Sequence, residues 1–296
     1  MKRFKRLGVF LHDSPAEEIA LAYTARLAAL ADSESVFCIH VHDKGEETAW
    51  PDLEPENFKA RVLAMLPPEI AERTTVEVHE GSGVPEMLRS ARDRELDLMI
   101  VGRRLPSNQM GIGSTFNRLA RKAPCSVLVV PNRVHLHLGR FLVPIDFSEH
   151  SKMALETALA FARSNSTEKP QVVAQTVYCV GYGYKKTGVG FHEAGRQLED
   201  RVQKKFGRFI RQVDTDGVDF EFICTCSERT SAAVHDLASV MKMDMIVVGS
   251  RGVSTSPAAL LGGTAERILC DSPLPVLLVK RKGETVHLLD ALLGQK

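Results

Sequence analysis

The sequence predicts an α/β protein made of two tandem doubly wound parallel sheets, and two observations support this class. Short apolar runs of strand length alternate with stretches whose apolar residues recur at helical spacing. That alternation is typical of parallel strands covered by helices on both faces. Three segments also occur twice, in the same order along the chain, which indicates a duplicated domain.

The repeat sets the domain organisation. Its boundary falls near residues 131–138, so we expect one domain over residues 1–136 and a second over residues 137–296. The matched segments are 9–14 with 142–147, 96–104 with 243–251, and 123–130 with 272–279.

Each half contains five apolar runs that we interpret as strands. A helix should follow the first strand of each half, because Ser14 before Pro15 and the matching Ser148 are both suited to an N-cap. The expected strands lie near residues 7–12, 35–41, 74–79, 97–101 and 126–130, and then near 140–145, 171–179, 218–225, 244–248 and 275–279.

Composition excludes several functional classes. The chain has 296 residues, and its 38 Lys and Arg residues against 37 Asp and Glu residues leave a net charge of +1. Such a balance gives no general attraction for nucleic acid or for anionic lipid, so neither is expected as a partner. The apolar run Leu7–Leu11 is too short for a signal peptide, and no stretch approaches the ~20 apolar residues of a membrane span. We expect a cytoplasmic protein.

The six cysteines fit a reducing compartment, because none forms a C-x-x-C pair. Cys224 and Cys226 fall on one face of an expected strand. Packing explains them better than a metal site, since no further Cys or His lies close in sequence to complete four ligands.

The strongest chemical signal is a glycine-rich connection in the second half. It reads Gly249-Ser250-Arg251-Gly252, then nine residues, then Gly262-Gly263-Thr264 at the start of a helix; we call residues 249–264 the glycine loop. Glycines allow positive φ and close approach to a ligand, and several backbone N–H groups at a helix N-terminus bind phosphate well. The alternative is a glycine-rich turn with no ligand.

This pattern resembles the ATP-binding signature of universal stress proteins, and the resemblance spans nearly the whole chain twice. It implies five-stranded sheets of order 3-2-1-4-5, as in adenine nucleotide alpha-hydrolase-like folds, with two halves related by pseudo-two-fold symmetry and paired through their last strands. It also implies an ATP site in the second half, where Mg²⁺ could accompany the nucleotide. The residues carried over are Pro144, Asp146 and Val177 for adenine and ribose, and Val248, Gly249, Arg251, Gly252, Gly262, Gly263 and Thr264 for ribose and phosphates.

The two halves depart from the family pattern differently. The second half has Gly263 where the family usually has Ser or Thr, so a hydroxyl donor is lost while the backbone donor remains. The first half keeps Asp13 and Gly113-Ser114-Thr115, but Leu105 replaces the second loop glycine and the loop is two residues shorter. A branched side chain held at positive φ is unfavourable, so we expect the first half to bind nucleotide poorly.

The first half carries one other candidate site. His12, His40, His42 and His79 lie near the carboxyl ends of its first three expected strands, where they could converge on a metal or an anion. Unrelated surface and core histidines explain them more simply than a shared site does, and the pair His135 and His137 fits a solvated linker.

No catalytic residue set is visible, because the chain lacks G-x-S-x-G, H-E-x-x-H and Walker A motifs. The Ser-Gly-Gly-x-Asp-Ser turn of related pyrophosphatase-type enzymes is also absent, since the turn here reads Asp146-Phe147-Ser148-Glu149. We therefore expect a nucleotide-binding stress-response regulator that forms homo-oligomers or binds a protein partner. A ligand-free dimerisation scaffold and a slow ATPase or other nucleotide hydrolase are the alternatives.

Overall fold

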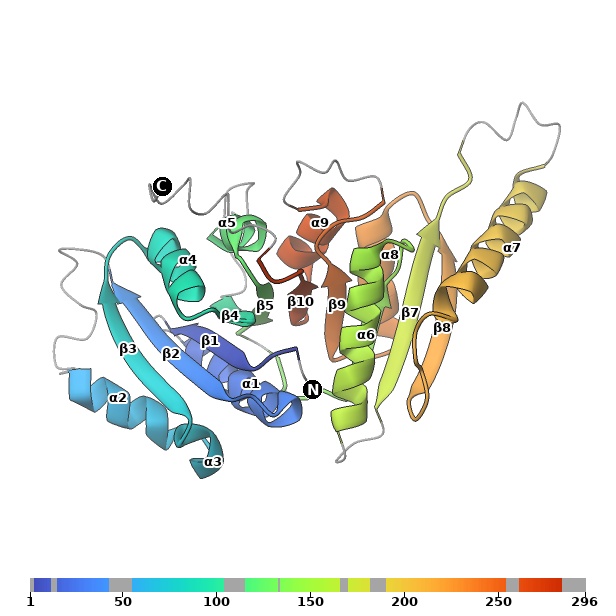
Figure 1. Cartoon of the computed structure of the whole chain (residues 1–296). Coiled ribbons are helices and arrows are strands. Elements are labelled where there is room, and N and C mark those ends of the chain that lie inside the picture. Colours follow the sequence, from blue (N-terminus) through green and yellow to red (C-terminus); the bar gives the residue numbers. More distant parts are fainter. Residues whose placement is uncertain are drawn as a thin grey trace. The chain divides into compact units, whose positions relative to one another are not determined.

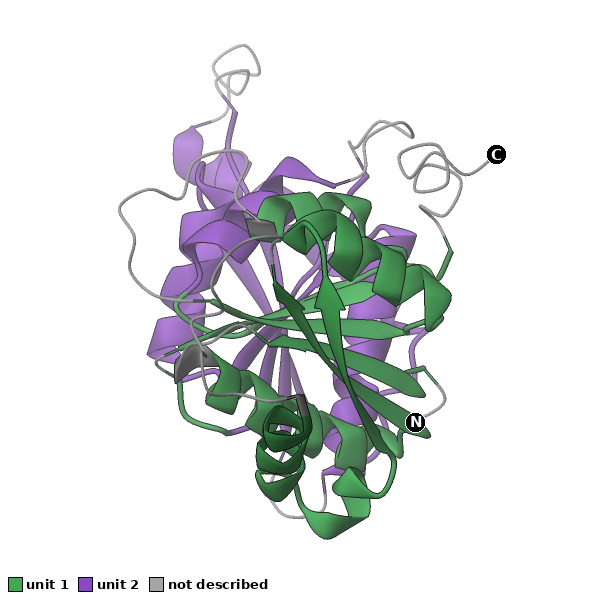
Figure 2. Ribbon diagram, turned by 90° about the vertical axis from the view of Figure 1, so that its left-hand side faces the viewer, with its two compact units in different colours: residues 1–136, 273–296 green, residues 137–272 purple. Residues whose placement is uncertain are grey.

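A computed structural model describes residues 3–11, 15–42, 55–103, 115–132, 134–165, 170–181, 190–253 and 261–283. The chain forms two compact units (Figure 2). The first combines Met1–Leu136 with Pro273–Lys296, and the second is His137–Ser272. Each unit is an α/β structure with a mainly parallel sheet (Figure 1). The division of the chain into domains 1–136 and 137–296 stays a prediction.

The first unit contains the five parallel strands expected for the first half, in the predicted order β3-β2-β1-β4-β5. They are β1 (Arg6–Leu11), β2 (Ser35–His42), β3 (Thr74–Glu80), β4 (Leu98–Arg103) and β5 (Ser126–Pro131). Their apolar side chains are almost completely buried, except on β3, the edge strand with which this order begins. The class and strand order predicted from the sequence are thus confirmed.

Helices cover both faces of this sheet. The ring of Phe58 on α2 lies 5.4 Å from the ring of His40, whereas Glu86 on α4 contacts His79 on the opposite face. The helices are α1 (Pro15–Ala31), α2 (Pro55–Ala64), α3 (Pro68–Ala71), α4 (Gly83–Asp93) and α5 (Thr115–Lys122).

The second unit repeats this design with four parallel strands in the order β8-β7-β6-β9. The strands are β6 (Arg140–Pro144), β7 (Gln171–Tyr178), β8 (Asp219–Cys226) and β9 (Met245–Gly249), and the helices are α6 (Glu149–Ser164), α7 (Phe191–Ile210), α8 (Thr230–Val240) and α9 (Gly263–Asp271). The predicted N-cap of α6 is confirmed, because the Ser148 side chain accepts a hydrogen bond from the Ser151 N–H.

The last strand of the chain, β10 (Val276–Val279), pairs antiparallel with β5 inside the first unit. Lys280, which follows it, is buried, and its ammonium donates to the carbonyls of Arg121 and Ala123 at the end of α5. A cation is favourable there because the last carbonyls of a helix lack partners. The implied pairing of the last strands of the two repeats is confirmed.

An aspartate ties the fourth strand of each half to the first. Asp97 accepts the backbone N–H groups of Lys5 and Arg6 at 2.9 Å each. Asp244 accepts those of Gly139 and Arg140 at 2.9 and 2.8 Å. The same contact therefore sets the register of the central strands twice, once in each copy.

Among the described helices, none is long and apolar enough to cross a membrane.

Replacing Asp244 by Ala should lower the free energy of unfolding by about 1–3 kcal/mol, because two N–H groups lose a charged acceptor. Urea unfolding of the full chain measures this. The matched control is Asp236→Ala, an exposed position on α8, which should change stability by less than about 0.5 kcal/mol. Equal effects of the two substitutions would contradict the role given to Asp244.

Candidate functional site

The candidate site of the second unit lies where β6 and β9 end. The loop after β6 carries Asp146, and the segment after β9 begins the glycine loop. Asp146 accepts the Val253 N–H at 2.8 Å through Oδ2 and the Ser148 N–H and hydroxyl at 3.0 and 2.6 Å through Oδ1. One exposed carboxylate therefore connects both segments.

The start of α9 forms the other side of the site. Gly262 is its N-cap and supplies no side-chain acceptor, and the Gly262 N–H donates to the Ser250 carbonyl at 2.8 Å. Gly263 and Thr264 follow and are exposed. The first N–H groups of a helix have no acceptor within it, so this end can bind an anion.

Gly249 and Gly262 of the glycine loop are not explained by the positive φ and the close approach to a ligand that the sequence predicts. A Cβ on Gly249 would lie 2.6 Å from the His150 carbonyl carbon, so close packing against the start of α6 requires glycine there. Gly262 has φ of −76°, which is ordinary extended backbone. The expectation that positive φ explains these glycines is therefore wrong at Gly262. At Gly249 the backbone closely approaches the start of α6, rather than a ligand as predicted. A Cβ on Gly263 would meet nothing within 4 Å.

The structure brings most of the predicted site residues to one sheet edge. Pro144 ends β6, and Val177 lies near the end of β7, whose Thr176 hydroxyl donates to the Ile145 carbonyl at 3.0 Å. Val248 is buried at the end of β9, while Arg251 and Gly252 are half-buried. The middle of the glycine loop, residues 254–260, lies outside the described residues.

Sequence reasoning missed Phe147, the residue beside Asp146. It has φ of +68°, a conformation that is unusual for a bulky side chain. Its ring packs edge-on against Phe209 at 5.6 Å, and the Lys205 ammonium lies 4.6 Å from its centre. These contacts with α7 hold the strained loop that carries Asp146, and no local sequence signal marks them.

The corresponding edge of the first unit is only partly described. Asp13, Leu105, Gly113 and Ser114 lie outside the described residues. Arg103 at the end of β4 is 1% exposed and stands where the second half has Ser250 in the aligned repeat. A large buried cation therefore takes the place of a small hydroxyl at this position of the first copy.

Comparison with known proteins identifies the repeated unit. A sequence profile of the Universal stress protein family matches residues 3–131 and again residues 137–280. The chain belongs to the universal stress protein family.

Individual relatives cover either about half of this chain or nearly all of it. A universal stress protein of Thermus aquaticus is 27% identical over 142 residues, which cover 47% of this chain and 96% of that protein. A solved putative universal stress protein from Pseudomonas aeruginosa matches 99% of this chain and 98% of its own, with a TM-score of 0.68 and 15% identity. One universal stress protein solved in complex with cAMP matches 44% of this chain and 99% of its own, with 13% identity and a TM-score of 0.35.

The described candidate histidines of the first half of this universal stress protein, His40, His42 and His79, do not form one site. His40 and His42 lie on one face of β2, with ring centres 6.1 Å apart, and His40 Nδ1 is 3.0 Å from the Leu11 carbonyl oxygen. In the sheet register His79 is opposite Val41, so its side chain points to the other face. His12 lies outside the described residues. Within the described chain, no group of three metal-ligating side chains is present.

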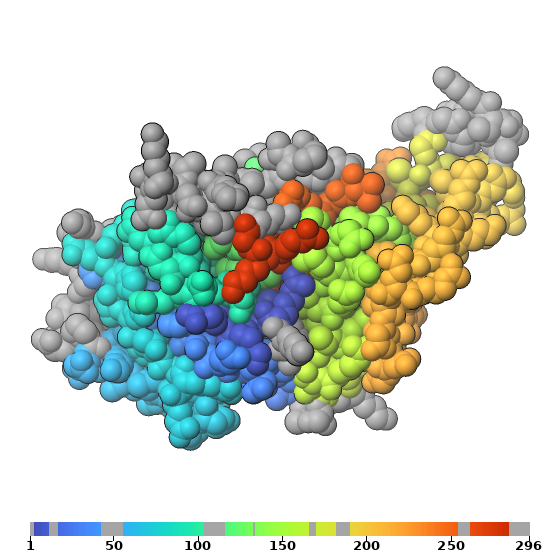
Figure 3. Space-filling view, in the orientation of Figure 1, coloured from blue at the N-terminus to red at the C-terminus, as the bar shows by residue number. Residues whose placement is uncertain are grey.

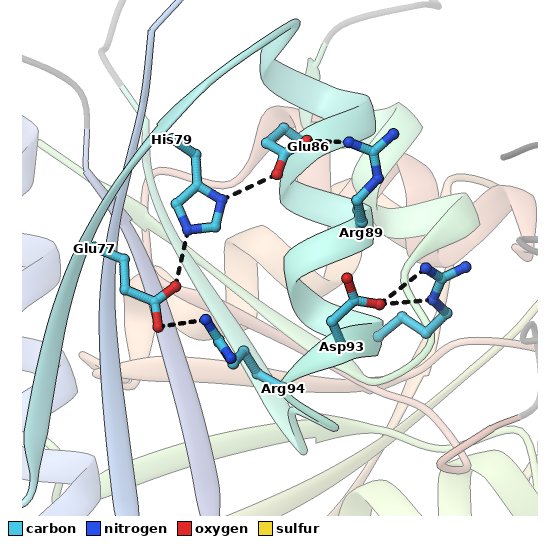
Figure 4. Close-up of polar contacts among 7 residues, drawn as sticks. Glu77, His79, Glu86, Arg89, Asp93 and Arg94 are labelled. Atoms are coloured by element: carbon cyan, nitrogen blue, oxygen red, sulfur yellow. Dashed lines mark hydrogen bonds and ion pairs between the residues drawn. The ribbon is translucent and has the colours of Figure 1, made fainter.

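His79 instead lies between two carboxylates (Figure 4). Its Nδ1 is 3.0 Å from Glu86 and its Nε2 is 2.8 Å from Glu77. Arg89 and Arg94 bind the outer oxygens of these carboxylates at 2.6 and 2.8 Å. Partial burial lowers the pKa of His79, but the hydrogen bonds and negative charges of Glu86 and Glu77 outweigh this, so its pKa is raised above 6.5.

The two buried cysteines are poor candidates for redox chemistry. Burial raises the pKa of Cys38 and of Cys125 to about 12, so neither thiol ionises readily. Cys224 is half-buried against Gln203 of α7, whereas Cys226 is exposed at the end of β8. Packing accounts for Cys224, and the exposure of Cys226 reflects its place at the strand terminus.

His79 should stabilise the fold more at low pH. Its pKa is higher in the folded chain than in the unfolded one, so the stabilisation is complete below about pH 6.5 and disappears as the pH rises through the folded-state pKa. Urea unfolding of the wild type and His79→Gln at about pH 5.5 and 8.5 tests this. The difference in free energy of unfolding should be larger at the lower pH, and a pH-independent difference would refute the assignment. His42→Gln is the control.

The strain at Phe147 predicts an unusual order of stabilities. Phe147→Ala removes the ring but keeps a side chain at positive φ, whereas Phe147→Gly removes both. The Gly variant should therefore unfold with a free energy about 1 kcal/mol higher than that of the Ala variant, as measured by urea titration. A more stable Ala variant would show that the loop relaxes without the ring.

Proposed function

We propose that the second half of this universal stress protein binds an adenine nucleotide, with ATP as the leading candidate, and thereby acts as a stress-response regulator. The observation that carries the proposal is the exposed start of α9, which has no side-chain cap. It lies at the carboxyl edge of a parallel sheet, where ligands of open α/β folds bind.

The phosphates would occupy the N–H groups at Gly263 and Thr264, where the helix dipole favours negative charge. Arg251 would add a positive charge close to them. Asp146 would accept a hydrogen bond from a ribose hydroxyl, and Pro144 and Val177 would flank the base. Mg²⁺ accompanying ATP would take most ligands from phosphate oxygens and water, because the described residues include no three-ligand protein site.

One observation favours the alternative of a ligand-free scaffold. Both Asp146 oxygens already accept hydrogen bonds from Ser148 and Val253, so the carboxylate has partners without any nucleotide. Ribose binding would have to share these oxygens or displace the Val253 N–H.

Calorimetry with ATP, together with mass spectrometry of ligand released from the purified protein, tests the proposal. Adenine nucleotide should be released from the wild type, and Gly252→Val should abolish binding because the new side chain blocks close approach of the ligand. Thermal unfolding checks that this variant remains folded.

A gain of affinity makes a sharper test. Gly263→Ser fits the open space at this position and adds a hydroxyl donor, so it should tighten ATP binding about two- to twelve-fold. The control Gly263→Ala adds a Cβ without a donor and should not tighten ATP binding.

If no nucleotide is released and neither the wild type nor Gly263→Ser shows heat with ATP, the scaffold function replaces the proposal. Steady ATP turnover that a single acid or base substitution abolishes would instead indicate a hydrolase.

A further inference from the structure

Helix α7 carries a continuous stripe of basic side chains. Its members, here called the basic stripe, recur at intervals of one or three residues along the second half of the helix and its C-cap, so they follow one helix face. All five are exposed, and residues 201–213 contain no Asp or Glu. The basic stripe consists of Arg201, Lys204, Lys205, Arg208 and Arg211.

The charges of the basic stripe are not neutralised within the described residues. No ion pair there involves any of the five, although Lys205 lies over the Phe147 ring. Other cations nearby are paired, as in Arg196 with Glu193 and Arg163 with Asp214, at 3.1 Å each. Asp200 precedes the stripe and Asp214 follows it, so the acidic side chains closest in sequence lie at its ends.

The adjoining face of α7 packs against the rest of the unit. Phe206 stacks on Phe222 of β8 with ring centres 3.5 Å apart, and Phe209 packs against Phe147. Along residues 201–211 the charged side chains of α7 therefore point outward, and Figure 3 shows the gold surface of α7 on the viewer's side. A helix that binds in a membrane interface needs a free apolar face, and between residues 201 and 211 the large apolar side chains of α7, Phe206 and Phe209, are buried.

The spacing of the cations matches a phosphate backbone. The ten-residue separation of Arg201 and Arg211 corresponds to about 15 Å along the helix. A nucleic-acid strand carries one charge per roughly 3.4 Å of axis, so about four or five phosphates fall within this length. Single strands also require exposed aromatic side chains for base stacking, and the aromatic residues between positions 201 and 213, Phe206 and Phe209, are buried.

We propose that the basic stripe of α7 is a docking surface for the phosphate backbone of duplex nucleic acid. Recognition is independent of base sequence, because the stripe offers charge rather than a surface that reads base edges. The net charge of +1 does not reveal this basic surface, because the acidic residues that balance its charge lie elsewhere in the chain. Binding is weak and strongly dependent on salt, as for other non-specific complexes.

Fluorescence polarisation with a labelled duplex of about 24 base pairs, at salt concentrations from about 20 to 150 mM, tests the proposal. The variant Lys204→Gln/Arg208→Gln/Arg211→Gln should bind at least about ten-fold more weakly at low salt. Its slope of log affinity against log salt should be shallower by about 2–3, because each lost phosphate contact removes about 0.9. Lys205 is left unchanged because it contacts Phe147.

The matched control is Lys59→Gln/Arg118→Gln/Arg281→Gln, which removes the same charge from exposed positions outside α7 and should keep the wild-type salt slope. Equal losses in the two triple variants would overturn the proposal, as would absence of duplex binding by the wild type at about 20 mM salt. Binding to phosphatidylserine vesicles but not to duplex would assign the stripe to a membrane surface instead. These measurements need no nucleotide, so their outcome is independent of the ATP proposal.

Discussion

The candidate site depends on one constraint, which is that β6, β7 and β9 run parallel and in register. Their carboxyl ends therefore reach the same edge of the sheet, together with the loops that follow them. The hydrogen bond between Asp146 and Val253 joins residues 107 positions apart in the sequence. Asp244, which binds the start of β6, supports that register from the opposite end of the strand.

The two copies of the domain use this edge differently. In the second unit, Gly249 lets β9 approach the start of α6, and the exposed start of α9 remains open to an anion. In the first unit, the buried Arg103 stands at the position of Ser250. The same duplicated framework thus carries a candidate phosphate site in the second unit. In the first unit, its polar cluster is formed by His79 and the carboxylates of Glu77 and Glu86.

Helix α7 serves the second unit through two unlike faces. Its apolar side covers β8 through Phe206 and holds the Asp146 loop through Phe209 and Phe147. Its basic side faces outward. Lys205 belongs to both the packed side and the basic side, because its ammonium lies over the Phe147 ring. The other cations of the stripe form no ion pair within the described residues.

The sequence alone determined the duplication, the parallel strands and the N-cap at Ser148, because these depend on local periodicity and on residues next to one another in the chain. It also predicted that the loop with Asp146 and the segment after β9 follow strands that end at one edge of the sheet, and the hydrogen bond between Asp146 and Val253 joins these two segments. Only the tertiary structure decided that His79 faces away from His40, that Gly249 is required by α6, and that Phe147 adopts positive φ. Those features depend on strand register and on packing between distant segments, which neighbouring residues in the sequence do not encode.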